Sequence, residues 1–315
     1  MNINWFKLKR KLLNNIVWIL LVLAVAVVGG LEPSFFKPTI LGNVLSQATV
    51  LGILSFAQAF AIMLGLIDLS LLGVMSFSAT CGLLLLEKGC PAVIAILVIF
   101  LTGACIGALN GVLIAKLKAV ALVETLAVKL TLLGAFLVIT QGRAITNMPD
   151  SYKWFGQGSI AGIPTLPIAL VAVFVFVYIL WNKTPYGRSL YAVGGNEDAA
   201  RVAGINVDKI KIQAYLIEGA LLGLASTLMA SRLKSASPNL GVGYELDAIA
   251  GCIIGGVSFT GGIGKVFDMV LGALIIGVIN NGMDLLGVEA FYKQVVKGSI
   301  IVVAVLIDRK RSGRS

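Results

Sequence analysis

Apolar segments close to the length of a membrane span follow one another along almost the whole chain. A helix needs about 20 predominantly apolar residues to cross the hydrocarbon core of a bilayer. Residues 1–315 are therefore predicted to form one all-α membrane domain, a polytopic helical bundle of about ten transmembrane helices with no separate soluble domain. The ten stretches are 16–33, 46–64, 72–87, 92–115, 119–140, 164–182, 212–231, 244–258, 266–287 and 293–307.

The overall composition is that of a chain solvated by lipid. Of the 315 residues, 58% are apolar and 13% are charged, whereas a soluble protein has about a quarter of its residues charged. Thirty-six glycines accompany only eight prolines, which suits membrane helices whose backbones approach closely. A disordered or collagen-like chain is therefore excluded.

Residue types that carry most enzymatic chemistry are missing or badly spaced. The chain has no histidine, which excludes histidine relays, histidine metal sites and Ser-His-Asp triads. Its four cysteines have no zinc-type spacing and are expected to be small buried apolar side chains. The glycines of 255–264 lack the GxxxxGK[ST] context of a nucleotide site. We therefore expect a non-catalytic protein with no metal and no cofactor.

The net charge of +10 is explained by topology. If the N-terminus lies inside, sixteen of the 25 lysines and arginines fall in cytoplasmic segments and seven in external loops. Because positive residues accumulate on the cytoplasmic side, both termini are predicted to be cytoplasmic. The charge is thus not a nucleic-acid patch, and no nucleic-acid partner is expected.

The longest internal loop, 183–211, contains a predicted short helix. Gly194 and Gly195 break the chain, and Asn196 is a good N-cap for a helix of about two turns that Gly204 closes in the left-handed conformation. A helix this short is marginal alone. It either packs on the bilayer surface or docks into a groove of a cytoplasmic protein, and the pattern by itself leaves both alternatives open.

Charged residues within spans are costly and so are candidates for function. Asp68 either caps the following span or has a functional role. Glu124 and Lys129 lie five residues apart in one span, so each is expected to have another partner or to face water. Glu218 and Lys297 lie near the starts of spans, where their side chains can snorkel to the interface.

Two further polar groups remain open. The Asn280–Asn281 pair can bond across helices or line a polar path. Tyr244, Glu245 and Asp247 open a short apolar stretch that ends in a glycine-rich turn, which indicates tight packing or a re-entrant backbone. Residues 66–77 faintly echo 245–259; related halves are common in transporters, but the match does not establish them.

Three stretches together resemble the ribose/galactose-type sugar permeases of bacterial ABC importers. They are WNKTPYGRSLYAVGGNEDAARVAGINV, ASRLKSASPNLGVGYELDAIAGCIIGGVSFTGGIG and LGALIIGVINNGMDLLGV, and GLIDLSLLG resembles the family's GGIDLSVGS element. The ending from Tyr292 looks most like the β-methylgalactoside/galactose member. The resemblance covers nearly the full chain and is densest over 181–308.

This resemblance implies a permease domain in the bacterial inner membrane that dimerises, most simply as a homodimer. It implies a cytoplasmic ABC ATPase and a periplasmic sugar-binding protein as partners, with lipid around the spans. The segment that it implies for ATPase coupling is Gly195, Asn196, Glu197, Asp198, Ala199, Ala200, Arg201, Val202, Ala203 and Gly204. The residues that it places near the path or its gates are Asp68, Ser70, Tyr244, Glu245 and Asp247, to which we add Asn280 and Asn281.

The chain departs from the family pattern in its first half. Leu66 replaces the second of two glycines before Asp68, and the family's P-F-I-x-T-L-G element becomes ALVETLA, which gains Glu124 with Lys129 just beyond it. The leading hypothesis is a monosaccharide permease subunit that works by alternating access, with ATP hydrolysed by a partner. The alternatives are an ion-coupled secondary transporter that uses Asp68 or Glu124, and an intramembrane enzyme.

Overall fold

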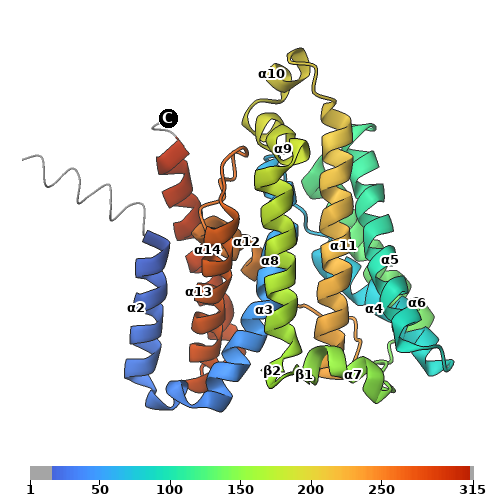
Figure 1. Cartoon of the computed structure of the whole chain (residues 1–315), viewed down its shortest axis with the longest axis vertical. Helices are drawn as coiled ribbons and strands as arrows, with labels where there is room; N and C mark the ends of the chain where they lie inside the picture. Colours follow the sequence, from blue (N-terminus) through green and yellow to red (C-terminus); the bar gives the residue numbers. More distant parts are fainter. Residues whose placement is uncertain (1–15, 313–315) are drawn as a thin grey trace, which may run out of the picture.

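The computed structural model describes residues 16–312 as a bundle of helices with one short hairpin (Figure 1). The two-residue strands β1 (Ser159–Ile160) and β2 (Ile163–Pro164) pair antiparallel. The helices are α2 (Ile16–Leu31), η1 (Pro33–Phe36), α3 (Pro38–Met63), α4 (Leu71–Glu87), α5 (Ala92–Ala115), α6 (Ala121–Thr140), α7 (Asp150–Gln157), α8 (Thr165–Lys183), α9 (Pro185–Gly195), α10 (Glu197–Val202), α11 (Val207–Leu233), α12 (Tyr244–Ile254), α13 (Val266–Leu285) and α14 (Ala290–Ser312).

Each of the ten apolar stretches contains a helix. Six described helices are long and apolar enough to cross a membrane, namely α3, α5, α6, α8, α11 and α13. Helices α2 and α4 are apolar but shorter, and α12 has only 11 residues. The all-helical, polytopic architecture is therefore confirmed, and ten crossings with both termini inside remain a prediction.

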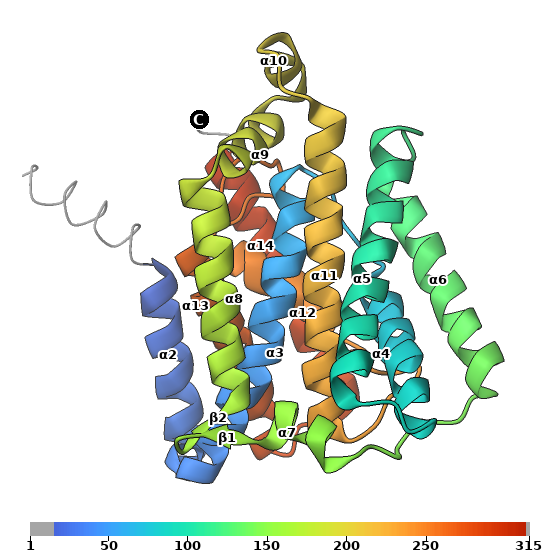
Figure 2. The same cartoon turned by 45° about the vertical axis from the view of Figure 1, so that its right-hand side comes forward.

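Burial separates a central group of helices from an outer one. Most residues in the apolar windows of α3, α11 and α13 are buried, whereas few residues of α6 are fully buried. Figure 2 shows α6 at one edge of the bundle and α2 at the other, with α3 and α11 between them. An outer helix with apolar side chains is stable in lipid, which is as apolar as leucine.

Helices α5 and α11 pack closely along much of their length, through glycines spaced four apart. Gly103 and Gly107 of α5 face Gly219 and Gly223 of α11. A Cβ atom on Gly107 would lie 2.9 Å from the Cα of Gly219, and one on Gly103 would lie 2.9 Å from the backbone nitrogen of Gly223. The two backbones therefore touch, because no side chain separates them.

Two of the short helices begin inside the bundle after an unwound segment. Helix α3 ends before Gly65, whose φ is +70°, and residues 66–70 have no regular secondary structure up to the start of α4. Helix α11 ends at Leu233 and is followed by Lys234 in the left-handed region, and α12 starts after Gly243, whose φ is +84°. At Gly65 and Gly243 a positive φ costs little, so the chain can turn there before the next helix begins.

The same order of long and short helices occurs twice in the chain, and the second set runs through the bundle in the opposite direction. Helices α3 to α6 and α11 to α14 both run long, short, long, long, and Figure 1 shows α3 and α11 traversing the bundle in opposite senses. Contacts repeat as well, since α3 packs on α13 as α11 packs on α5, and α4 packs on α5 and α6 as α12 packs on α13 and α14. The faint echo between 66–77 and 245–259 therefore falls at corresponding positions of two inverted four-helix units.

Candidate functional site

The predicted short helix of the internal loop is present as α10. The side chain of Asn196 accepts a hydrogen bond from the backbone N–H of Ala199 at 2.9 Å, and Gly204 has a φ of +83°. Both ends are thus closed as the sequence indicated. The preceding segment was predicted wrongly as a break, since α9 runs through Gly194 to Gly195 before the chain turns.

Helix α10 projects beyond the rest of the bundle, at the end of the molecule towards which α14 runs (Figure 1). Only Ala200 of this helix is buried. The small apolar face formed by Ala199, Val202 and Ala203 points outward, and Val202 is 90% exposed. A valine with so much exposed surface at the tip of a projecting helix is available for contact with another protein.

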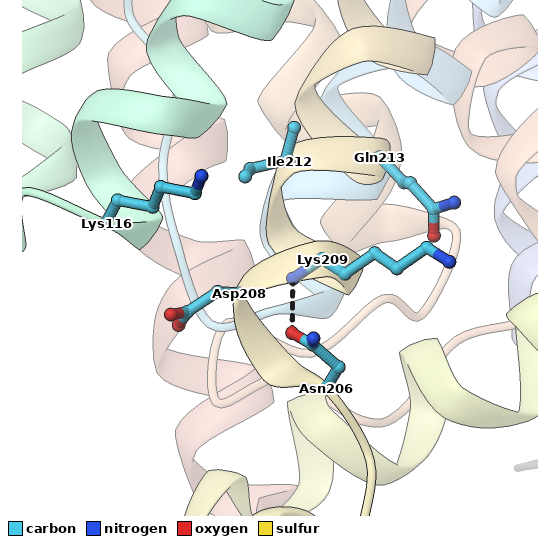
Figure 3. A pocket seen from close by; sticks show the side chains of 6 residues that line it. All are labelled: Lys116, Asn206, Asp208, Lys209, Ile212 and Gln213. Atoms are coloured by element: carbon cyan, nitrogen blue, oxygen red, sulfur yellow. Dashed lines mark hydrogen bonds between the residues drawn. The ribbon is translucent and has the colours of Figure 1, made fainter.

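A cavity of about 400 Å³ opens between the end of α5 and the start of α11. Figure 3 shows Lys116 reaching from the end of α5 towards Ile212 of α11. The side chain of Asn206 caps α11 by accepting a bond from the backbone N–H of Lys209 at 3.0 Å. The other lining residues are Asp208 and Gln213. This part of the surface is therefore hollowed, and all of its lining residues except Ile212 carry a charged or amide group.

Helix α9 joins the internal loop to the bundle through backbone atoms. A Cβ atom on Gly194 would lie 2.7 Å from the nitrogen of Gly262 and even closer to the carbonyl oxygen of Met63. The N–H of Gly262 donates to that same Met63 oxygen at 2.9 Å. Tyr191 adds a bond from its hydroxyl to the carbonyl of Gly264 at 2.7 Å. The end of α3, the turn after α12 and α9 thus meet at one point, which we call the glycine junction (Met63, Gly194, Gly262).

The Asp68–Ser70 element is buried and fixed to two neighbouring helices. Asp68 is 1% exposed, and its Oδ1 accepts the backbone N–H of Ser70 at 2.5 Å, at the start of α4. Ser70 Oγ accepts a bond from Asn110 of α5 at 3.1 Å. The backbone N–H of Leu69 donates to Thr125 of α6 at 3.0 Å. Asp68 therefore fixes the turn before α4 without capping the helix itself, because the N-cap is Ser70 and no side chain caps α4.

The start of α12 carries two ion pairs within the bundle. Lys129 Nζ of α6 lies 2.7 Å from each carboxylate oxygen of Glu245. Asp247 Oδ2 accepts from Lys297 Nζ of α14 at 2.7 Å and from Asn280 of α13 at 2.8 Å. Lys129 therefore has a partner on another helix, as expected. For Lys297 the snorkelling interpretation was wrong, because its ammonium is bound inside.

The predicted path residues form two groups rather than one. Asp68 and Ser70 lie at the start of α4, and Glu245, Asp247 and Asn280 surround the start of α12. Tyr244 is half-buried at the first position of α12. Asn281 is buried, and its side-chain oxygen has no hydrogen-bond partner among the described residues. The two groups occupy corresponding places in the inverted units.

Glu218 is deeply buried, which corrects the prediction that it snorkels. It is 1% exposed near the middle of α11, and within the described part of the chain neither carboxyl oxygen has a hydrogen-bond partner. Gln58 of α3 is equally buried and unpartnered there, and sequence reasoning missed it. A polar residue at a core position of a long apolar run was the only signal that could have indicated Gln58.

These features define a class of protein. Several helices are long enough to span a bilayer, two short helices start inside the bundle with charged or hydroxyl side chains, and a small helix projects from one end. Broken helices within a bundle are typical of membrane transport proteins, in which irregular backbone lines a cavity or is buried in protein.

Comparison with known proteins agrees with this class. The chain belongs to the family described as "Branched-chain amino acid transport system / permease component", which it matches over residues 40–305. It is 42% identical to the ribose import permease protein of Bacillus subtilis (strain 168), over 93% of this chain and 91% of that protein. The Escherichia coli K12 ribose import permease protein is 39% identical over 93% and 92% of the two chains.

The galactose/methyl galactoside import permease protein of Salmonella typhimurium is 34% identical over 95% of this chain and 94% of that protein. The chain is thus identified with the sugar ABC importer permeases, and it is a multi-pass membrane protein. Identity is higher to the ribose permeases, although the ending from Tyr292 resembled the galactose member. No solved structure matches the chain.

Proposed function

We propose that this chain is the membrane-spanning subunit of an ATP-driven monosaccharide importer of the ribose or galactose type, located in a bacterial inner membrane. Support comes from relatives named as ribose and galactose/methyl galactoside import permeases over more than nine-tenths of the chain. In this proposal the chain itself hydrolyses nothing and binds no cofactor. Ten helices cross the membrane, and the α10 end of the molecule is cytoplasmic.

The exposed face of α10 is the observation that carries the proposal. An outward valine flanked by two alanines suits the apolar anchor of a helix that enters a groove on a partner. We assign residues 195–204 to coupling with a cytoplasmic ABC ATPase, which docks on their outward face at Ala199, Val202 and Ala203. The cavity at Lys116 and Gln213 we assign to a side chain of that partner. A helix that only covered the ends of the neighbouring spans would bury its apolar face against them, whereas this face is exposed on a helix that projects beyond the bundle (Figure 1).

We assign the two polar groups at the starts of α4 and α12 to the sugar path or its gates. Unwound segments beside charged side chains are typical of transport sites near the middle of the membrane. The path is completed by a second permease subunit, in the simplest case an identical copy, and a periplasmic sugar-binding protein delivers the substrate. Movement between outward and inward states follows from a shift in their populations when ATP binds to the partner.

Energy coupling tests the proposal directly. The chain is reconstituted in liposomes with a matching ATPase and binding protein, and uptake of labelled ribose and galactose is followed. Uptake is expected to require ATP on the side of the membrane where the ATPase is bound. It is expected to persist when an uncoupler collapses ion gradients. Uptake that stops with the uncoupler at constant ATP would instead support an ion-coupled transporter that uses Asp68 or Glu124.

Asp247→Asn is expected to lower the uptake rate by about tenfold or more. The amide removes the negative charge that holds Lys297, so an ammonium is left without its counter-ion at a site where the Asp247 side chain is only 3% exposed. Co-purification with the ATPase is expected to stay within about twofold of the original protein. Asp150→Asn, an exposed carboxylate of α7, is the matched control. If the Asp247→Asn protein is fully active, Asp247 has no role in transport and acts only as a structural cap.

A further inference from the structure

Lys211 lies near the start of α11, at the cytoplasmic end in the proposed topology, and its side chain is only 11% exposed. A lysine withdrawn from water requires an anionic partner. Its Nζ lies 2.6 Å from Oε2 of Glu197, the first residue of α10. This ion pair attaches the projecting helix directly to α11.

The same carboxylate begins a chain of alternating charges. Glu197 Oε1 accepts a hydrogen bond from Arg201 Nη2 at 3.2 Å, within α10. Arg201 Nη2 also lies 4.0 Å from Asp208 Oδ1, and Lys118 Nζ lies 3.0 Å from that oxygen. Helix α10 is thereby connected both to α11 and to the turn between α5 and α6.

The Glu197–Lys211 pair is the least hydrated link in this chain of charges. The side chains of Lys118 and Arg201 are 60% and 52% exposed, so water and salt weaken their pairs. The hydrogen bond from Lys211 lowers the pKa of the Glu197 carboxyl. That carboxyl is therefore charged at neutral pH, and the link is present under the conditions in which transport is measured.

Helix α11 contacts enough of the bundle to pass a movement of α10 on to several other helices. It is mostly buried and packs on α5, α3 and α4, so it contacts both inverted units. Its contact with α5 is backbone to backbone at the glycines. Meanwhile Val202 points away from the bundle, which leaves the docking face of α10 free while the opposite side is bound to α11.

We propose that the Glu197–Lys211 ion pair is the positioning link through which a docked partner moves α11. This inference rests on the proposed function, because it takes α10 to be the docking helix. It assigns the pair to the transfer of motion, and it assigns docking itself to the outward face. Loss of the pair therefore separates ATP hydrolysis from sugar movement without detaching the ATPase.

The test uses the full importer in liposomes with Glu197→Gln, Lys211→Met and the double variant. For each, we measure ATPase affinity for the permease, ATP hydrolysis, and the number of sugar molecules moved per ATP. Each single variant is expected to reduce sugar per ATP by about tenfold, with ATPase affinity within about threefold. Because both residues act through one contact, the double variant is expected to lose no more than either single variant.

Lys183→Met is the control, since this exposed lysine at the end of α8 makes no ion pair within the described residues. The inference is overturned if sugar per ATP is unchanged in both single variants, if their losses add in the double variant, or if ATPase affinity falls as much as sugar per ATP. Thermal melting of the Glu197→Gln protein checks that the fold is intact. Absence of ATP-dependent uptake by the original protein would instead overturn the proposed function.

Discussion

Gly107→Leu is expected to prevent α5 and α11 from packing and to remove most of the folded protein. Even a Cβ atom at this position would lie 2.9 Å from the Cα of Gly219 and closer to the carbonyl oxygen of Tyr215. Backbone atoms cannot rotate away as a side chain does, so the helices must separate along the contact. Overpacking of a tight core costs about 1–3 kcal/mol and occasionally more, and a contact between two backbones lies at the upper end.

Yield of monodisperse protein in detergent and its melting temperature measure this effect. We expect the yield to fall by about tenfold or more, since 1.4 kcal/mol changes a folding equilibrium tenfold. Gly134→Leu is the matched control, because a Cβ on that α6 glycine meets nothing within 4 Å. Similar yields for the two variants would show that the close approach of α5 and α11 is not required for stability.

Replacement of residues 197–202 by a glycine–serine linker is expected to abolish co-purification of the ATPase and ATP-dependent uptake. The replacement removes the docking face while the flanking helices α9 and α11 keep their own contacts with the bundle. A few central side chains dominate most protein interfaces, so Val202→Asp alone is expected to weaken ATPase binding by about two orders of magnitude.

Ile160→Asp, an exposed apolar residue of β1 at the α7 end of the bundle, provides the matched control for ATPase binding. Membrane insertion of all variants is checked by their amounts in the membrane fraction. Normal sugar-stimulated ATP hydrolysis by the linker variant would contradict the assignment of α10 to docking.

Hydropathy predicted where the helices lie, because an apolar run inside lipid must satisfy its backbone hydrogen bonds internally and does so as a helix. It predicted their ends less well. Helix α3 starts at Pro38, eight residues before the expected span, and α11 starts at Val207 because Asn206 caps it. Helical ends that extend beyond the apolar run depend on capping and on contacts with neighbours, which average hydropathy does not contain.

Only those features of the site that depend on residues close together in the sequence could be predicted. Asn196 and Gly204 fix α10 through residues a few positions apart, so the sequence pattern was sufficient. The partners of charged residues were not predictable, since Lys129 and Glu245 are 116 positions apart. This pair also shows that Lys129, a departure from the family pattern, is balanced by an anion on another helix. Among the glycines, the spacing of Gly103, Gly107 and Gly111 was a signal available in the sequence.

The glycine junction has a mechanical consequence. At most contacts between helices, side chains change rotamer and absorb a small displacement before it reaches the backbone. At Met63, Gly194 and Gly262 the main chains themselves are in contact, so there is no such slack. A movement of α9 is therefore expected to reach the end of α3 and the turn after α12 directly, since both contact it through backbone atoms. The projecting loop is thus joined to the broken helices by main-chain contacts, which side-chain rotation cannot loosen.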